Sequence, residues 1–375
     1  MAKVMRAVGQ CFLRPLTHPM PIAKSLTHSF AHSPQSDIRD GKGPASSLFL
    51  NAVTPVPTPS AGQVLVKIQA FGLNRMDLIQ RNGHYPVPPQ APSTLGVEFS
   101  GTVVSLGSPP SPHAHTHAHT RTHNFAVGDQ VFGLAYGGAY AEYIAVSSKM
   151  LLPLPEHLTP IQAAGIPETW ITATQALHFI LGITPGKSIL WHAGASGVSI
   201  AGIQLSRLAG AGAIFATAGT AAKCAFIEKE LGATAAFNYR DQDWADEILK
   251  RTDGKGVDLI VDFVGASYFQ KNIDVVARDG RICLLGLMGG GVVDRVDIGK
   301  LLYKRARVEG STLRSRDEEY QGRLRDKLEG YLPSFESGEL KVFVDTVLPW
   351  EDIIKAHELL EENKTMGKII CTISS

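Results

Sequence analysis

The sequence predicts an α/β protein with a small β-rich domain and a second domain built on a doubly wound parallel sheet. The first observation is a set of short apolar runs, each typical of a buried strand, that alternate with helical patterns. The first run lies in the stretch that begins at Lys187, and the others lie at 213–217, 257–262 and 281–286. Strands that alternate with helices favour a parallel sheet whose ligand sits at the strand ends. The second observation is the stretch 63–70, whose alternating apolar and polar side chains are typical of a half-buried strand.

The residues after 63–70 support the β-rich domain. Further strand patterns lie at 95–104, 127–133 and 138–144, separated by turns that contain glycine or proline. Short strands joined by such turns are typical of a small barrel-like domain.

The first strand of the parallel sheet leads into a glycine-rich turn. The residues of this turn and the first helical residue are Gly194, Ala195, Ser196, Gly197 and Val198. A helix that begins there directs unpaired backbone N–H groups over the end of the strand, and such a site favours a phosphate. Glycines also serve ordinary tight turns, but the alternation of strands and helices around this turn favours a dinucleotide site.

Composition and charge exclude several classes of protein. The 375 residues suffice for two domains, and 36 basic against 35 acidic residues give no field that would hold nucleic acid or an acidic membrane. We therefore expect a small-molecule substrate. No apolar run is long enough to span a bilayer and no signal-peptide core is present, so we expect a cytoplasmic protein. The four cysteines form no CxxC pair, which indicates free thiols.

Two stretches interrupt the pattern. After a strand expected at 5–8, residues 17–50 are rich in Pro, Ser, His and Gly without periodicity, which predicts an insertion or surface loop. Residues 108–124 carry five histidines. Imidazoles could bind a transition metal, but the low complexity and flanking prolines favour a surface loop.

The sequence also predicts where the domains begin and end. The nucleotide-fold pattern stops after Gly310, and later strands at 344–348 and 367–373 are expected to return to the first domain. The predicted domains are a catalytic domain over 1–157, a nucleotide-binding domain over 158–311 and a returning segment over 312–375.

Eight short motifs, taken together, resemble one known family. They are Met5-Arg6-Ala7-Val8, Asn74-Arg75-Met76-Asp77, Gly96-Val97-Glu98-Phe99-Ser100-Gly101, Gly128-Asp129-Gln130-Val131, Ala163-Ala164-Gly165-Ile166-Pro167, His192-Ala193-Gly194-Ala195-Ser196-Gly197-Val198, Gly286-Leu287-Met288-Gly289-Gly290-Gly291 and Leu313-Arg314-Ser315-Arg316. Their order resembles the medium-chain dehydrogenase/reductase superfamily, and within it the zinc-free, zeta-crystallin-like NADPH quinone oxidoreductases. The resemblance implies a GroES-like catalytic domain, a Rossmann NADPH-binding domain, and a homo-oligomer, a dimer or tetramer, joined at the sheet edge near 281–285.

The resemblance also implies that no metal takes part. In the alcohol dehydrogenase branch, a Cys, a His beside a Glu, and a later Cys hold a catalytic zinc. The matching positions here carry Asn74, Val97 and the pair Pro167-Glu168. Asn and Val cannot replace a thiolate and an imidazole as zinc ligands, so we expect no metal.

The end of the second parallel strand predicts the cofactor. NAD-specific sites place a carboxylate there, whereas residues 216–220 carry none and Lys223 follows one helical turn later. Although most lysines of this kind are solvated residues on a helix face, a nearby cation favours the 2′-phosphate of NADPH. The resemblance places Thr220, next to Gly219, and Tyr239 beside Lys223 around this phosphate.

Other cofactor contacts follow from the resemblance alone. Gly286, Leu287 and Met288 resemble the turn that passes the nicotinamide, and Leu313 and Lys368 resemble outlying contacts. Relatives commonly keep Gly where this chain has Ser199, and because Ser is only slightly larger we expect a small shift of the helix.

We predict that the protein transfers a hydride from NADPH to a quinone or related conjugated carbonyl. Asn74 and Tyr85 are the expected polar groups on the substrate side, where Tyr85 hydrogen-bonds the acceptor oxygen as charge develops. Tyr85 could instead merely pack in its Pro-rich loop.

Two alternatives remain. Asn74, Asp77, Gly83 and Tyr85 also match the pattern of enoyl thioester (2-enoyl) reductases, in which the Tyr supplies a proton. Some zeta-crystallin-like proteins bind RNA or act as structural crystallins, but the near-neutral charge disfavours nucleic acid here.

Overall fold

The computed structural model describes residues 32–108 and 124–374. The strand predicted at 5–8 and all five histidines of the stretch 108–124 lie outside the described residues.

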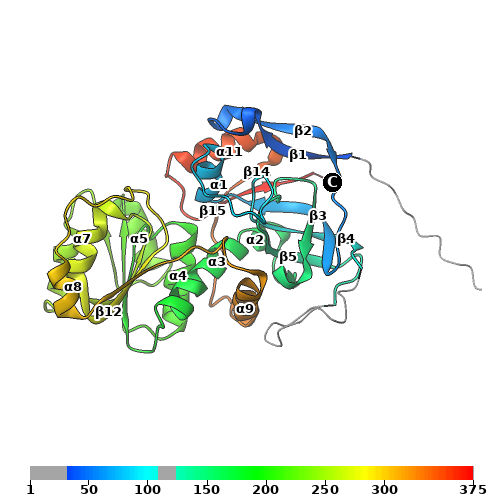
Figure 1. The fold of residues 1–375 in the computed structure, drawn as a ribbon. Coiled ribbons are helices and arrows are strands. Elements are labelled where there is room, and N and C mark those ends of the chain that lie inside the picture. The colour runs from blue at the N-terminus through cyan, green and yellow to red at the C-terminus, as the bar shows by residue number, and fades with distance from the viewer. Residues whose placement is uncertain (1–31, 109–123, 375) are drawn as a thin grey trace, which may run out of the picture. The chain divides into compact units, whose positions relative to one another are not determined.

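The β-rich part is a seven-stranded sheet with the order β14-β15-β3-β4-β5-β7, in which β6 also pairs with β3 (Figure 1). Its strands are β3 (Gln63–Gly72), β4 (Glu98–Leu106), β5 (Gln130–Leu134), β6 (Tyr143–Ser147), β7 (Leu151–Pro153), β14 (Val344–Pro349) and β15 (Lys368–Thr372). In β3, the partly exposed Lys67 and Gln69 alternate with the buried Ile68 and Ala70, as the sequence predicts. In β15, Cys371 lies opposite Phe71 of β3, so the C-terminal segment completes the sheet that the earlier residues begin.

The second sheet has six parallel strands in the order β10-β9-β8-β11-β12-β13. They are β8 (Ser188–Trp191), β9 (Ala213–Ala218), β10 (Ala235–Asn238), β11 (Val257–Asp262), β12 (Val276–Leu284) and β13 (Arg307–Gly310). This confirms the predicted doubly wound sheet. The strand order reverses between β8 and β11, and a crevice for a ligand is expected at the carboxyl ends of strands at such a point.

The prediction that 281–285 form the sheet edge is wrong. β13 pairs alongside β12, with Arg281 opposite Arg307 and Cys283 opposite Glu309, so β13 and not β12 is the terminal strand of the described sheet. The sequence does not predict this strand, because all four residues of β13 are exposed and carry no apolar pattern.

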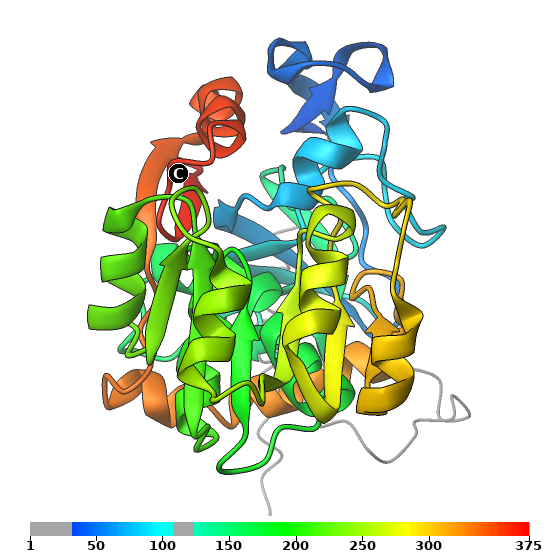
Figure 2. The ribbon, with the colours of Figure 1, turned by 90° about the vertical axis from the view of Figure 1, so that its left-hand side faces the viewer.

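Helices cover both faces of this sheet (Figures 1 and 2). They are α4 (Gly197–Leu208), α5 (Ala221–Lys229), α6 (Trp244–Arg251), α7 (Ala266–Val275) and α8 (Ile298–Lys304). Because successive strand residues point to opposite faces, Ile189 and Trp191 pack in one buried cluster with residues of α4 and α5, and Leu190 packs in another with residues of α6 and α7. A Cβ on Gly202 would lie 2.1 Å from Trp191 Cη2, so only glycine lets α4 approach β8 this closely.

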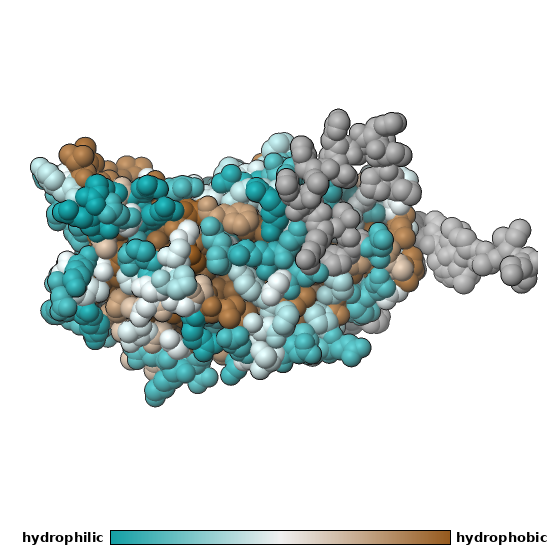
Figure 3. Space-filling model, turned by 90° about the horizontal axis from the view of Figure 1, so that it is seen from below, coloured by the Kyte–Doolittle hydropathy of each residue, from teal (hydrophilic) through white to brown (hydrophobic). Residues whose placement is uncertain are grey.

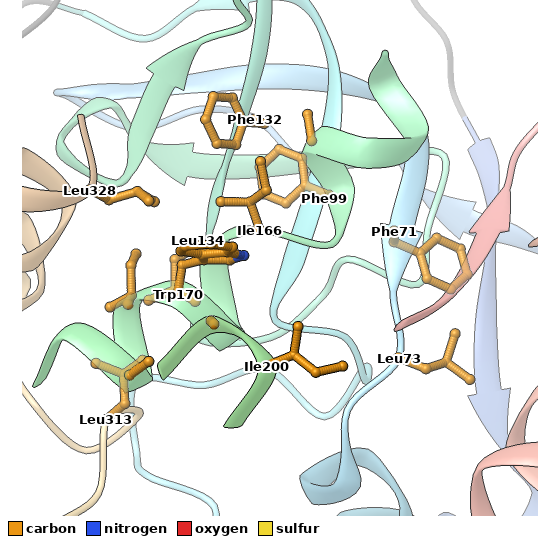
Figure 4. Packing of buried hydrophobic residues seen from close by; sticks show 14 of the residues in the cluster. Phe71, Leu73, Phe99, Phe132, Leu134, Ile166, Trp170, Ile200, Leu313 and Leu328 are labelled. Carbon is orange, nitrogen blue, oxygen red and sulfur yellow. The ribbon is translucent and has the colours of Figure 1, made fainter. Parts of the chain in front are cut away.

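Two helices, α2 (Pro160–Ala164) and α3 (Pro167–Thr174), connect the sheets. Trp170 of α3 packs in one buried cluster with residues of both sheets and of α4 (Figure 4). The same cluster includes Ile166, Phe99, Leu134 and Ile200, which are labelled in that view. The core is therefore continuous from the β-rich sheet to the helices of the parallel sheet.

The part of 17–50 that the structure describes is not an irregular loop, contrary to the prediction. Residues 32–55 form an antiparallel hairpin of β1 (His32–Ile38) and β2 (Leu48–Pro55). Its first strand is polar and lacks periodicity, but Ser36 N donates to Tyr140 O at 2.7 Å and Leu48 is 1% exposed. Tertiary contacts therefore order a segment whose own sequence does not predict a strand.

The remaining described helices lie outside the two sheets. They are α1 (Arg75–Arg81), α9 (Glu318–Glu329), α10 (Leu332–Glu336) and α11 (Ile353–Glu361), with 3₁₀ turns at Arg39–Gly41, Ala45–Ser47, Ser148–Met150 and Trp350–Asp352 and a π-helical segment at Gln175–Ile180. Within the described ranges, no helix combines the length and the hydropathy that a membrane span requires. The face seen from below mixes hydrophilic and hydrophobic side chains (Figure 3).

Candidate functional site

The glycine-rich turn links β8 to α4 at the point where the strand order reverses. Gly194 N donates to Thr217 O at 2.8 Å, and a Cβ on Gly194 would lie 2.9 Å from Ala216 Cβ. The turn therefore lies directly against β9. Ser196 caps α4, a helix of 12 residues, and accepts from Ser199 N at 3.4 Å. The start of α4 thus offers backbone N–H groups to an anion above the strand ends.

Ser199 fits without an unpaired polar group. It is fully buried, and its hydroxyl donates to His192 O at 2.8 Å. Because the hydroxyl is satisfied inside the turn, the exchange of glycine for serine leaves no buried donor without a partner.

Gly197 marks the contact between this turn and the β-rich sheet. A Cβ there would lie 2.8 Å from Thr169 Cγ2 and 3.0 Å from Lys368 Cδ. The first turn of α3 and the start of β15 therefore adjoin the turn at 194–198 that is predicted to bind a phosphate, which we call the phosphate seat.

The residues predicted to hold the 2′-phosphate come together at the end of β9. A Cβ on Gly219 would lie 2.6 Å from Tyr239 Oη, and Thr220 caps α5 by accepting from Lys223 N at 3.2 Å. Lys223 Nζ donates to Asn363 O at 2.7 Å. Burial lowers the pKa of Lys223, Asp345 opposes this, and Arg240 lowers the pKa further.

Arg240 is a second cation at this corner that the sequence reasoning missed. Its positive charge contributes to the lowered pKa of Lys223. The available signal was a basic residue directly after Tyr239. A dianionic phosphate would relieve repulsion between two cations, so this corner fits the extra phosphate of NADPH.

The turn predicted to pass the nicotinamide follows β12. Leu287 is 60% exposed and Met288 is 53% exposed, although both are apolar. Met288 N donates to Phe263 O at 3.1 Å, which fixes the turn against the end of β11. In contrast, Leu313 is 6% exposed and belongs to the main core cluster, so its side chain serves packing.

Asn74 and Lys368 form a buried polar cluster with Glu98. Lys368 Nζ donates to Leu73 O at 2.6 Å, to Asn74 Oδ1 at 2.7 Å and to Glu98 Oε1 at 2.6 Å. Asn74 Nδ2 donates to Glu98 Oε1 at 2.9 Å. These three acceptors match the three donors of an ammonium group. The side chain of Lys368 therefore holds Asn74 and Glu98 in place.

Two further carboxyl groups adjoin this cluster. Burial raises the pKa of Asp77 to about 6, while hydrogen bonds from Asn74 N, Gly96 N and Tyr140 Oη partly offset the shift. Burial, followed by repulsion from Glu98, raises the pKa of Glu168 to about 8. Both positions thus favour a neutral carboxyl group more than water does.

Tyr85 lies beside Arg314. The Arg314 guanidinium carbon is 5.4 Å from the centroid of the Tyr85 ring, and Nη1 donates to Gln80 Oε1 at 2.6 Å. Arg314 Nε donates to Tyr136 O, whereas Nη2 is buried without a hydrogen-bond partner among the described residues. Burial and then Glu168 raise the pKa of Tyr85, and Arg314 opposes them.

The structure therefore brings Asn74 and Tyr85 to one region through groups that the sequence reasoning did not assign. Glu168 interacts electrostatically with Tyr85, Glu98 and Arg314. Glu168 and Arg314 both lie in or beside motifs of the resemblance, but nothing in the order of the chain indicates that they meet. Across the described part of the chain, no group of three or more His, Cys, Asp or Glu side chains is arranged to hold a metal.

Comparisons with family models agree with this arrangement. Residues 60–156 match the alcohol dehydrogenase GroES-like domain, and residues 197–329 match the family described as zinc-binding dehydrogenase. The first match spans β3 to β7 of the β-rich sheet and the second spans β9 to β13 of the parallel sheet, and they confirm the predicted GroES-like and Rossmann folds.

Curated relatives are similar over most of the chain. The synaptic vesicle membrane protein VAT-1 homolog of Rattus norvegicus is 30% identical over 333 residues, which cover 85% of this chain and 78% of that protein. The quinone oxidoreductase of Homo sapiens is 29% identical over 325 residues, which cover 86% of this chain and 93% of that protein.

Solved structures are similar as well. Escherichia coli quinone oxidoreductase in complex with NADPH superposes with a TM-score of 0.77 at 27% identity, covering 91% of this chain and 99% of that chain. An NAD-dependent alcohol dehydrogenase superposes with a TM-score of 0.76 at 31% identity, covering 91% and 100%.

Proposed function

The chain belongs to the medium-chain dehydrogenase/reductase superfamily and is similar to its zinc-free quinone oxidoreductases, and on this premise we propose that it catalyses zinc-independent hydride transfer from NADPH to quinones or related conjugated carbonyls. The observation that carries the proposal is the contact of Gly197, at the start of α4, with Thr169 and Lys368. This contact supports the proposal, because Lys368 adjoins the start of α4 and also binds Asn74 and Glu98, and a reaction between cofactor and acceptor requires the two to be close.

The residues of the parallel sheet fit NADPH. Gly194 lets the turn lie directly against β9, where a side chain would collide with Ala216, and α4 offers its N–H groups to a pyrophosphate. Lys223, Thr220 and Tyr239, joined by Arg240, are proposed to hold the 2′-phosphate. The backbone turn at 286–288 is proposed to pass the nicotinamide and to cover it with Leu287 and Met288.

Each polar group near the acceptor has a separate task in this proposal. NADPH, when bound, supplies the hydride. Tyr85 donates a hydrogen bond to the acceptor oxygen as negative charge grows there. Asn74 is held by Lys368 and Glu98, so its amide has a fixed orientation for the nicotinamide ribose or the acceptor. Asn74 and Val97 stand where the zinc-dependent branch carries ligands, which supports a reaction without metal.

The proposal is tested by following NADPH oxidation with ortho-quinones, para-quinones, enals and enoyl thioesters, with NADH as the control. We expect turnover of at least one quinone class and a strong preference for NADPH. Calorimetric titration that detects binding of neither reduced nicotinamide would contradict the proposal.

Enoyl thioester reduction is a second candidate, because Tyr85 is a half-buried phenol beside a buried guanidinium. A phenol in such a place could protonate a carbon centre after hydride transfer. Reduction of crotonyl thioesters in the same screen, without reduction of quinones, would favour it. Steep salt-dependent RNA retention by the purified protein, together with no NADPH oxidation in the presence of any acceptor, would instead indicate RNA binding or a structural crystallin-like role.

We also propose a cytoplasmic homo-oligomer, a dimer or tetramer. Its interface would be the exposed edge of β13 and the neighbouring α8, where Ile298, Leu302 and Tyr303 are 70%, 73% and 76% exposed. Light scattering of the purified protein tests the oligomer, with Leu302→Lys expected to lower the molar mass. Imaging of a tagged full-length chain tests the location.

A further inference from the structure

Glu168 lies where three parts of the protein meet. It is the second residue of α3, and its backbone N–H donates to Glu98 Oε2 of β4 at 2.9 Å. Its neighbour Thr169 adjoins Gly197, where the predicted phosphate seat begins. The side chain is partly exposed, and its carboxyl group makes no hydrogen bond to any residue within the described ranges.

The cations near Glu168 are already engaged. Lys368 directs its three donors to Leu73, Asn74 and Glu98. Arg314 uses two of its nitrogens on Gln80 and Tyr136, and only Nη2 is left without a partner in the described part of the chain. A negative charge on Glu168 would therefore add to the charges of Glu98 and Asp77, and Lys368 and Arg314 would neutralise little of it.

The balance of these charges sets the protonation state. The N-terminus of α3 favours a carboxylate, as do Lys368 and Arg314. Burial, together with Glu98 and Asp77, outweighs them and raises the pKa of Glu168 to about 8. At neutral pH the side chain is then mainly a carboxylic acid, which can donate a proton.

We propose that Glu168 is the catalytic acid of this site, the group that delivers a proton to the acceptor as the hydride arrives, a role that rests on the proposed function. The acceptor gains a hydride from NADPH and a proton from the Glu168 carboxyl group. A quinone is thereby reduced to a hydroquinone, NADPH is oxidised to NADP⁺, and the carboxylate that remains regains its proton from solvent. Because the side chain is partly exposed, water can reach the carboxylate and return the proton.

Glu168 suits this task better than Tyr85 does. Burial and Glu168 raise the pKa of Tyr85 above its ordinary value of 10.0, so the phenol releases its proton less readily than it would in water. An acid whose pKa is close to the working pH is both protonated and able to give up its proton. Tyr85 then serves as a hydrogen-bond donor to the acceptor, and Arg314, which has only donors, cannot accept the phenolic proton.

The test compares Glu168→Gln with the wild-type protein and with Glu156→Gln, an exposed carboxyl control. For wild type and control we expect kcat to fall as the pH rises through about 8. For Glu168→Gln we expect about a hundredfold lower kcat at pH 7 and a flat profile in this range, with unchanged NADPH affinity. Glu168→Asp is expected to restore part of the rate and the pH-dependent limb.

A second readout does not depend on turnover. Infrared difference spectra between pH 7 and pH 10 should show a protonated carboxyl band that is lost in Glu168→Gln and kept in Glu156→Gln. If the wild-type protein reduces quinones and Glu168→Gln keeps both its rate and its pH limb, the inference fails while the proposed function stands. If no acceptor is reduced by any variant, the proposed function fails and takes this role with it, even where the band is present.

Discussion

Lys368 Nζ lies 2.6 Å from Glu98 Oε1 in an ion pair whose side chains are only 6% and 0% exposed. Replacing Lys368 with Met would leave a buried carboxylate without its cation. We expect the free energy of unfolding to fall by about 3–5 kcal/mol, because an uncompensated buried charge is costly. Denaturation in urea measures the loss.

The double variant Lys368→Met, Glu98→Gln is the matched control, because it removes both charges. It should recover a large part of the lost stability. If Lys368→Met instead keeps wild-type stability and loses only NADPH affinity, the lysine is a cofactor contact, as the resemblance implies, and the pair contributes little to the fold.

Lys223→Ala tests the seat of the 2′-phosphate. Loss of a charge-assisted hydrogen bond should weaken NADPH binding by about 1.5–3 kcal/mol, roughly ten- to a hundredfold in Kd, and leave NADH binding nearly unchanged. Calorimetry with both cofactors measures the change. Lys229→Ala, an exposed position in the last turn of the same helix, is the control and should alter neither affinity. Equal losses for the two cofactors would show that Lys223 does not distinguish them.

The sequence could predict what is encoded locally. The turn at Gly194 and the cation at Lys223 each lie within a few residues of the strand that positions them, so spacing alone indicates their places. The electrostatic interaction of Glu168 with Arg314 depends on how α3 and the segment after β13 pack, and no periodicity in the sequence predicts it. The strand at 32–38 was missed for a related reason, because its order comes from partners such as Tyr140 and not from its own residues.

Tyr85→Phe separates the two candidate reactions. If the phenol only donates a hydrogen bond to a quinone oxygen, its loss should reduce kcat/KM on quinones by about tenfold, or 1–1.5 kcal/mol. If it protonates an enoyl thioester, crotonyl thioester reduction should fall by a hundredfold or more while quinone reduction is untouched. Steady-state rates with both substrates decide between these outcomes.

His357 should make the protein sensitive to acid. Its Nδ1 accepts from Arg81 Nη1 at 3.1 Å, and burial, followed by Arg81, lowers the pKa of His357 to about 3. Because the folded pKa lies below the ordinary value of 6.5, this group's stabilising contribution is complete above pH 6.5 and is lost as the pH falls towards 3. The loss approaches about 1.4 kcal/mol per pH unit.

Urea denaturation at pH 7 and pH 5 measures this effect in His357→Gln, whose amide oxygen can still accept from Arg81 and does not titrate. We expect the variant to lose less stability than wild type between the two pH values. His157→Gln, at an exposed position, is the control and should follow wild type. An unchanged pH dependence in His357→Gln would exclude this histidine as a source of acid sensitivity.

Glu168→Gln should change the pH dependence of stability at alkaline pH, whereas His357→Gln changes it at acidic pH. The folded pKa of about 8 lies above the ordinary value of 4.5, so the stability linked to this group is complete below pH 4.5 and is lost as the pH rises through 8. The amide that replaces the carboxyl group cannot ionise, and the variant should therefore gain stability over wild type on the order of 1–2 kcal/mol at pH 9, after allowance for the partly exposed carboxyl group. Denaturation of both proteins at pH 5 and pH 9 measures the difference. A gain of equal size at both pH values would mean that packing, and not the ionisation of Glu168, separates the two proteins.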